Sequence, residues 1–237
     1  MGCTDMSEAG LLIKNDSDDL LINDTYNNLY LFRKLKLTDL PYQAIGNTGA
    51  KMYYTNLQDN EVIAPVAKTS GGELRVFSVH GASNGYLQNA GQWQFFVPAN
   101  ENIDDVYAYI FGVNTSTETQ AHGYGMQVYD ENGVCVYNSN NKPMRVLHYA
   151  NNVGDTNKWD GELDGYVVPS NRVCAIHNCA VARVAMGAGQ SRPVRMFNAY
   201  ISASGEVLQQ AAIFGVVPIS FVLGDYIGYM VVDVTNY

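Results

Sequence analysis

The chain has 237 residues, enough for one large β domain or for two domains of roughly 100–120 residues each. Its net charge is −9, from 14 basic and 23 acidic residues, which argues against binding to nucleic-acid phosphates or to anionic lipid. Tyrosine and glycine are common, at 17 and 22 copies. Tyrosine favours strands and glycine favours turns, so this composition predicts an all-β protein.

The first residues, "MGCTDMSEAG", have neither the basic start nor the apolar stretch of a secretory signal. We expect residues 1–8 to form a flexible arm. No apolar run reaches 18 residues, so no membrane insertion is expected. The cysteines, Cys3, Cys135, Cys174 and Cys179, are too sparse for a disulfide framework and are expected to be reduced, in a protein made in a cytoplasm.

The first predicted element is a hairpin in "AGLLIKNDSDDLLIND", which begins at Ala9. Its turn carries Asp16, Asp18 and Asp19, which are candidates for a calcium loop. The stretch has no glycine at the turn and no following bidentate glutamate, so solvated turn residues are the competing interpretation. The stretch "DDLLINDTYNNLYLFRKLKL" has the alternation of a strand and asparagine pairs typical of turns, with a short helix around Tyr30 as the alternative.

Short apolar runs separated by Gly, Pro or Asn continue to residue 113, which predicts a β-sandwich-like domain over 9–113. In "QWQFFVP", alternation places Trp93 and Phe95 on one face. They are expected in the core, although exposed aromatic side chains also suit a sugar-binding or protein-binding face. The polar stretch 114–122 is the predicted linker.

A second hairpin is predicted in "GYGMQVYDENGVCVYNS", residues 123–139. Asn132-Gly133 is typical of a two-residue type I′ turn, which would place Val128 opposite Tyr137 and Asp130 opposite Cys135. The two hairpins align with a constant offset, 125 − 10 = 115 and 138 − 23 = 115. Since 115 is about half of 237, internal duplication is a hypothesis.

A second β-sandwich-like domain is expected over 123–237, because tyrosine- and valine-rich runs recur there. The run 173–186 contains enough alanine for a helix to remain an alternative to a strand. Within it, Cys174, His177 and Cys179 have the types of side chain that bind zinc. No second ligand pair is evident, so buried thiols are the competing interpretation.

No catalytic, cofactor-binding or metal-binding residues are predicted. The sequence contains no nucleophile elbow, phosphate loop or paired-carboxylate motif, and solvated turn residues and buried thiols are the preferred interpretations of the two possible metal sites. A polysaccharide or peptidoglycan hydrolase remains an alternative, since folding can bring any two acids together. The loop "NNVGDTNKWDG" supplies one candidate contact site, formed by Trp159, Asp155 and Asp160.

The hairpin segments resemble a recurring segment of small tailed-phage virion proteins from the tail-tip and tail-fibre gene region. The matching residues of the second segment are Tyr124, Gly125, Gln127, Val128, Asn132, Gly133, Val136, Asn138, Ser139, Met144 and Val146. Those of the first are Gly10, Leu11, Ile13, Ile22 and Tyr26. The resemblance brings no catalytic residues with it.

This resemblance implies a non-enzymatic structural component of a phage virion, at the tail tip or the tail-fibre attachment. Its expected partners are other virion tail proteins and further copies of itself. A receptor- or carbohydrate-binding module for host recognition is the alternative, with a host surface receptor or polysaccharide as the partner. The expected location is the virion tail, after synthesis in the host cytoplasm.

Overall fold

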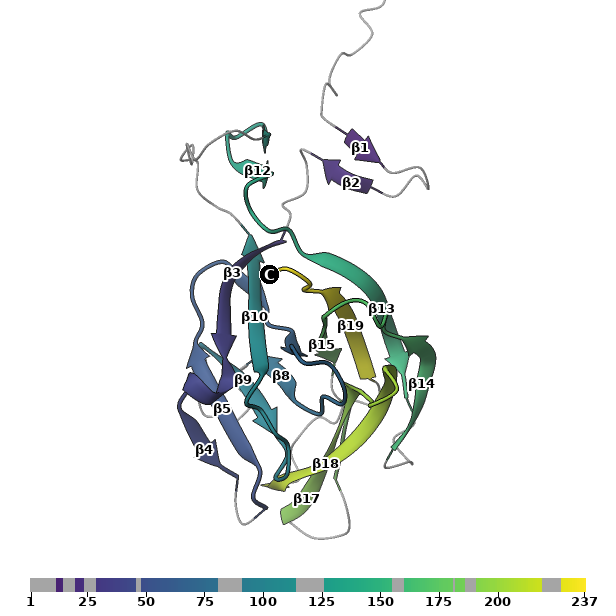
Figure 1. Ribbon diagram of the computed structural model, residues 1–237. Coiled ribbons are helices and arrows are strands. Elements are labelled where there is room, and N and C mark those ends of the chain that lie inside the picture. The colour runs from purple at the N-terminus through teal and green to yellow at the C-terminus, as the bar shows by residue number, and fades with distance from the viewer. Residues whose placement is uncertain are drawn as a thin grey trace, which may run out of the picture.

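The computed structural model describes residues 12–14, 20–23, 29–45, 48–80, 91–113, 126–154, 160–180, 182–185, 191–218 and 227–237. Within these ranges the regular elements are β-strands, apart from one short 3-10 helix, η1 (Leu37–Asp39). The strand pairs are antiparallel throughout the described part. The prediction of an all-β fold is confirmed (Figure 1).

The largest sheet has seven strands and draws on both halves of the chain. Its order is β13-β19-β15-β7-β10-β3, and β6 also pairs with β10. The strands are β3 (Leu29–Lys36), β6 (Glu61–Ile63), β7 (Val66–Lys68), β10 (Val106–Val113), β13 (Arg145–Val153), β15 (Cys174–Ala180) and β19 (Ile227–Asp233). The two halves join where Val66 of β7 pairs with Ile176 of β15.

Two four-stranded sheets accompany the large one, each from one half of the chain. The first has the order β4-β5-β9-β8 and the second β14-β18-β17-β16. The first sheet contains β4 (Tyr42–Ala44), β5 (Lys51–Asn56), β8 (Phe77–His80) and β9 (Gln92–Val97). The second contains β14 (Asp160–Val167), β16 (Ala182–Ala185), β17 (Ser191–Ile201) and β18 (Glu206–Pro218).

The halves share a pattern of strand neighbours. The series β3-β10-β7 with β5-β9-β8 in the first half has the same connectivity as β13-β19-β15 with β14-β18-β17 in the second. Each half therefore has a sandwich-like pair of sheets, as predicted for an Asn- and Gly-punctuated β chain. That this likeness arose by internal duplication stays a prediction.

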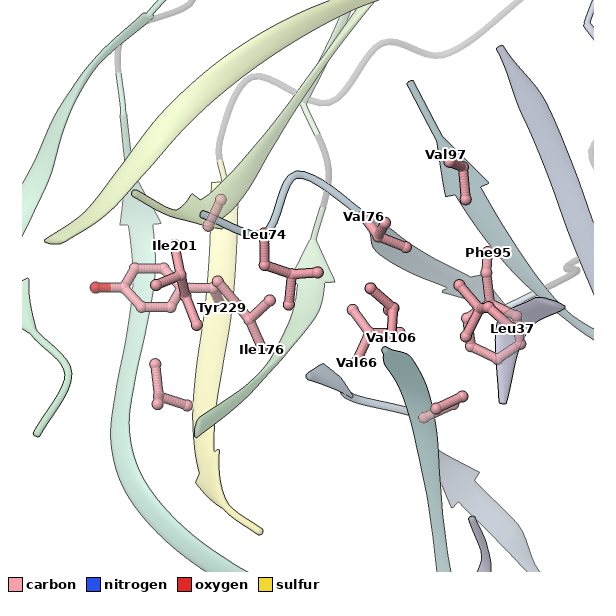
Figure 2. Packing of buried hydrophobic residues seen from close by; sticks show 14 of the residues in the cluster. Leu37, Val66, Leu74, Val76, Phe95, Val97, Val106, Ile176, Ile201 and Tyr229 are labelled. Atoms are coloured by element: carbon pink, nitrogen blue, oxygen red, sulfur yellow. The ribbon is translucent and has the colours of Figure 1, made fainter. Parts of the chain in front are cut away.

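A single large hydrophobic core spans both halves (Figure 2). Val106, Ala108 and Ile110 of β10 point into it, whereas Tyr109 and Phe111 belong to a smaller cluster. This division follows from the two-residue period of a strand. The members from the two halves that Figure 2 labels are Leu37, Val66, Leu74, Val76, Phe95, Val97, Val106, Ile176, Ile201 and Tyr229. The ranges predicted as domains thus share a sheet and a core, and the predicted linker, 114–122, lies outside the described residues.

The two edge strands of the large sheet come together where they begin. Leu31 N donates to Lys142 O at 2.9 Å, and Met144 N donates to Leu29 O at 2.7 Å. Tyr30 forms a bridge with Pro143 between these bonds. These contacts tie the start of β13 to the start of β3, so the halves are joined at the edges of the sheet as well as at its centre.

The two predicted hairpins are present as separate two-stranded sheets: β1 (Leu12–Lys14) with β2 (Leu20–Asn23), and β11 (Gln127–Tyr129) with β12 (Cys135–Asn138). Their strand bounds differ by the offset of 115 throughout, for example 127 − 12 = 115 and 138 − 23 = 115. Their registers also agree, because Leu12 pairs with Asn23 as Gln127 pairs with Asn138.

The turn of the second hairpin differs from the prediction. Gly133 has a positive φ of 77°, but Asp130 N donates to Val134 O, so the loop has three residues rather than two. The Asp130 carboxylate accepts hydrogen bonds from Asn132 N and Val134 N, which favours a type I turn followed by a left-handed glycine. Val128 still faces Tyr137, whereas the extra loop residue places Tyr129 opposite Cys135.

In the two stretches for which a helix was the alternative, the described residues form strands, apart from residues such as 173 and 37 at their ends. Residues 174–180 and 182–185 form β15 and β16, and residues 20–23 and 29–36 form β2 and β3. In β15 the alanine content is compatible with a strand because Ala175 is completely buried in the smaller cluster on the second face of the large sheet. Burial in the sheet therefore outweighs the helical propensity of alanine.

Candidate functional site

Three loops converge beside the junction of the two halves and enclose a pocket of about 530 Å³, hereafter the junction pocket. They are the loop after β7, the loop between β14 and β15, and the turn between β17 and β18. The residues that line it are Lys68, Thr69, Ser70, Gly71, Gly72, Leu74, Val168, Pro169, Ser170, Asn171, Arg172, Val173, Cys174, Ile201, Ser202, Ala203, Ser204, Gly205 and Thr235. A pocket of this volume suits a small molecule.

Backbone hydrogen bonds fix these loops to one another. Leu74 N donates to Ile201 O at 2.8 Å, and Ile201 N donates back to Leu74 O at 3.3 Å. Val168 N donates to Gly205 O at 2.9 Å, and Gly205 has the positive φ of 86° that its turn requires. The walls from the two halves are therefore positioned by main-chain contacts and not by side chains alone.

The loop after β7 is anchored from behind by Asp105. The Asp105 carboxylate accepts a hydrogen bond from Ser70 N at 2.9 Å, and its main-chain oxygen accepts one from Thr69 N at 3.0 Å. Burial alone would raise the pKa of Asp105, but the hydrogen bonds from Ser70 and the charge of Lys68 lower it below its usual range. Asp105 is therefore a stable anionic anchor at neutral pH.

The charged residues of the pocket lining are Lys68 and Arg172. The Arg172 guanidinium donates to Asp233 Oδ2 at 2.8 Å, and the Asp233 side chain is only 3% exposed. The third ionisable group of the lining is the thiol of Cys174, whose pKa burial and the charge of Asp233 raise to about 11, although Arg172 opposes the shift. The Cys174 thiol is therefore neutral near pH 7, and the lining carries positive charge.

A second polar cluster lies between β13, β14 and β19. His148 Nε2 lies 2.6 Å from Asp164 Oδ2, and the His148 ring stacks on Tyr166 with centroids 4.1 Å apart. The hydroxyl of Tyr229 donates to the other carboxylate oxygen of Asp164. Burial would raise the pKa of Asp164, but the hydrogen bonds from Tyr229 and His148 lower it. This cluster connects the large sheet to the edge of the second four-stranded sheet.

The chemistry available to this cluster is limited. A His–Asp pair can act in nucleophilic catalysis when a serine, threonine or cysteine lies against the histidine. The described contacts of His148 are instead an aspartate and two tyrosines. A serine does lie against a different histidine: Ser78 Oγ is 3.1 Å from His177 Nδ1. This contact is buried between β8 and β15, with Ser78 completely inaccessible. Both arrangements connect strands.

The predicted contact site of Trp159, Asp155 and Asp160 stays a prediction. Trp159 and Asp155 lie outside the described residues, and Asp160 is the first residue of β14, where it pairs with Gln210. The aspartates of the candidate calcium loop, Asp16, Asp18 and Asp19, also lie outside, so that interpretation stays open.

The zinc interpretation of Cys174, His177 and Cys179 has no support from the geometry. No group of three His, Cys, Asp or Glu side chains is close enough to hold a metal among the residues that the structure describes. His177 Nδ1 lies 3.1 Å from Ser78 Oγ. Of the predicted buried thiols, Cys174 is buried and Cys179 is exposed.

The prediction that Trp93 and Phe95 belong to the core is confirmed, since they are 1% and 0% exposed. The junction pocket, in contrast, was not predicted. Its loops are visible in the sequence as "TSGG", "PSNR" and "SASG", three short Ser/Gly/Asn stretches that each follow a strand. Nothing in their spacing indicates that they meet, because they converge through tertiary contacts: the pairing of β7 with β15 and the bridge between Leu74 and Ile201.

Within the described ranges, no helix has the length and apolar character needed to cross a bilayer. Comparison with protein-family models, with curated proteins and with solved structures found no match.

Proposed function

We propose that this chain is a non-enzymatic structural component of a bacteriophage virion, at the tail tip or the tail-fibre attachment, and that it acts by packing against other tail proteins. The observation that carries the proposal is the pair of small hairpin sheets. They are the two segments that resemble tail proteins, and they have equal strand lengths and the same register. They lie at the same end of the molecule, beyond the main body (Figure 1).

Two-stranded sheets suit assembly because each strand has only one neighbouring strand in its sheet. Within the described residues, β1, β2, β11 and β12 each pair with a single strand. Exposed strand edges are the usual sites of β-strand addition between chains. The second hairpin is also held firmly by the buried hydroxyl of Tyr30. This hydroxyl accepts a hydrogen bond from Asn138 N and donates one to Val136 O. A rigidly held hairpin favours specific packing against a neighbour.

The test is the protein content of purified phage particles. Mass spectrometry of density-purified virions should detect this chain at a constant number of copies per particle, and labelled antibody should place it at the tail by electron microscopy. Particles that carry a full set of tail proteins but lack this chain would refute the proposal.

A receptor- or carbohydrate-binding module is the second candidate function. The junction pocket favours it, because hydroxyl-bearing loops surround an apolar floor there. Binding of the purified chain to host cells and to their surface polysaccharide tests this candidate. Saturable binding that free polysaccharide displaces would support it, whereas normal incorporation into virions with no binding to cells would leave the structural function alone.

A further inference from the structure

We propose that the junction pocket binds a small ligand through a carboxylate or phosphate group, with Lys68 and Arg172 as the recognising cations. The proposal goes beyond a structural function and stands independently of it, because it rests on the pocket alone. Its first support is position. The pocket lies where Leu74 of the first half bridges to Ile201 of the second, and small-molecule sites are common at such junctions.

The charge of the lining is opposite to the charge of the chain. The whole chain carries −9, yet the lining contains Lys68 and Arg172 and no aspartate or glutamate. Glu101 and Asp105 are close enough to act electrostatically with Lys68, but neither lines the pocket. A concave site with cationic side chains concentrates anions from solution.

Arg172 is held in place before any ligand arrives. The Asp233 carboxylate accepts a hydrogen bond from the Arg172 guanidinium at 2.8 Å and also lies 3.6 Å from the guanidinium of Arg145. Neither Arg145 nor Asp233 lines the pocket, and the group of two arginines and one carboxylate has a net charge of +2 − 1 = +1. The arginine side chain is 42% exposed, so its remaining donors are accessible to a ligand. Arginine that is already oriented binds oxyanions at a lower cost in side-chain entropy.

The rest of the pocket limits the kind of ligand. Its floor is formed by the buried side chains of Leu74, Cys174 and Ile201, which favour an apolar or ring-shaped part. At the rim, Gly71 and Gly72 both have positive φ, and a side chain added to either would meet no atom within 4 Å. Open glycine backbone allows a ligand to approach the main chain closely. The expected ligand is therefore a compact molecule with one oxyanion, such as a phosphorylated or carboxylated sugar.

The experiment measures binding of three probes to the full chain by isothermal titration calorimetry and by thermal shift: inorganic phosphate, galacturonate and galactose. All titrations are matched in ionic strength with sodium chloride. We expect phosphate or galacturonate to bind and galactose, which lacks the carboxylate, to bind at least about tenfold more weakly. Whether phosphate or galacturonate binds more tightly also distinguishes a phosphate ligand from a carboxylate ligand.

Variants assign the binding to the pocket. Lys68→Gln should weaken the bound probe about tenfold, and Lys68→Arg, which keeps the charge, should restore most of the affinity. The matched control is Lys51→Gln. Lys51, on β5, lies over the ring of Tyr42 and does not line the pocket. The proposal is overturned if neither anion binds, if galactose binds as well as galacturonate, or if Lys51→Gln weakens binding as much as Lys68→Gln does.

Discussion

Glu61 shows how this protein accommodates a buried charge. Its carboxylate, 1% exposed, accepts two hydrogen bonds from the Arg33 guanidinium, one from the indole of Trp93 and one from Gln58 N. A buried carboxylate is tolerated only when its oxygens are satisfied in this way. Glu61 therefore joins β6, β3 and β9 through one side chain, which makes it a structural residue rather than a catalytic one.

Glu61→Gln should be strongly destabilising, because it leaves the partly buried Arg33 without its counter-ion. We expect a loss of about 3 kcal/mol in the free energy of unfolding, measured by urea denaturation. Glu73→Gln is the matched control, since the Glu73–Arg75 pair is more than 40% exposed on both side chains, and it should change stability by less than about 1 kcal/mol. Equal effects of the two variants would contradict this role for Glu61.

Gly133 tests the hairpin turn at the level of the backbone. Its φ is +77°, and no atom lies within 4 Å of a side chain added there, so substitution acts through backbone strain alone. Gly133→Val should cost about 1–3 kcal/mol. Gly133→Asn should cost less, because asparagine tolerates the left-handed conformation. If both variants melt at the temperature of the parent protein, the turn assignment is wrong.

At the scale of elements, local pattern predicted the two hairpins and strands such as β3 and β9, whereas tertiary contact determines how the strands pair into sheets. Alternation in "QWQFFVP" placed Trp93 and Phe95 correctly in the core, and the Asn-Gly step located a turn. The three-residue loop was not predictable from that step, because it depends on the carboxylate of Asp130 capping Asn132 N and Val134 N. The pairing of β7 with β15 joins residues more than one hundred positions apart, which periodicity cannot indicate.

We expect the stability of the protein to fall in acid because of Asp233, the last residue of β19. Burial would raise the pKa of Asp233, but hydrogen bonds from Thr235 and the charges of Arg145 and Arg172 lower it. Since the folded-state pKa is the lower one, its stabilisation is complete above the unfolded value, about 3.9, and is lost as the pH falls through the folded value. Asp233→Asn should therefore be destabilising at pH 7, and its deficit relative to the parent should shrink between pH 5 and pH 2.

Chemical denaturation of the parent and Asp233→Asn at several pH values measures this effect. Asp39→Asn is the control, because Asp39 lies in η1 with only a weak contact to Thr38 at 3.3 Å. A deficit for Asp233→Asn that stays constant over the whole pH range would show that the carboxylate does not stabilise β19 through its charge.

At the scale of the whole molecule, the joining of the two halves determines both the core and the junction pocket. Ile176 is completely buried, pairs with Val66 and lies in the core that both halves share. Ile176→Ala should lower the free energy of unfolding by about 2–5 kcal/mol. Val146→Ala is the control, since Val146 is 46% exposed, and it should be nearly neutral.

The readout for Ile176→Ala compares tryptophan fluorescence with far-ultraviolet circular dichroism of the whole chain. The second tryptophan, Trp159, is replaced by phenylalanine in both proteins, so that the fluorescence comes from Trp93 in the first half. Both signals should shift to the same lower midpoint, because the substitution acts on one shared core. If the tryptophan signal keeps the midpoint of the parent protein while the dichroism signal shifts, the halves unfold separately.

Differential scanning calorimetry of the intact chain tests the shared core most directly. Chains of this length do not unfold in one step by default, so a single transition is informative. The continuous sheet from β13 to β3 and the common core predict one transition, with a calorimetric enthalpy equal to the van't Hoff enthalpy. Two resolved transitions, each with its own enthalpy, would show that the halves are independent folding units and would contradict this account.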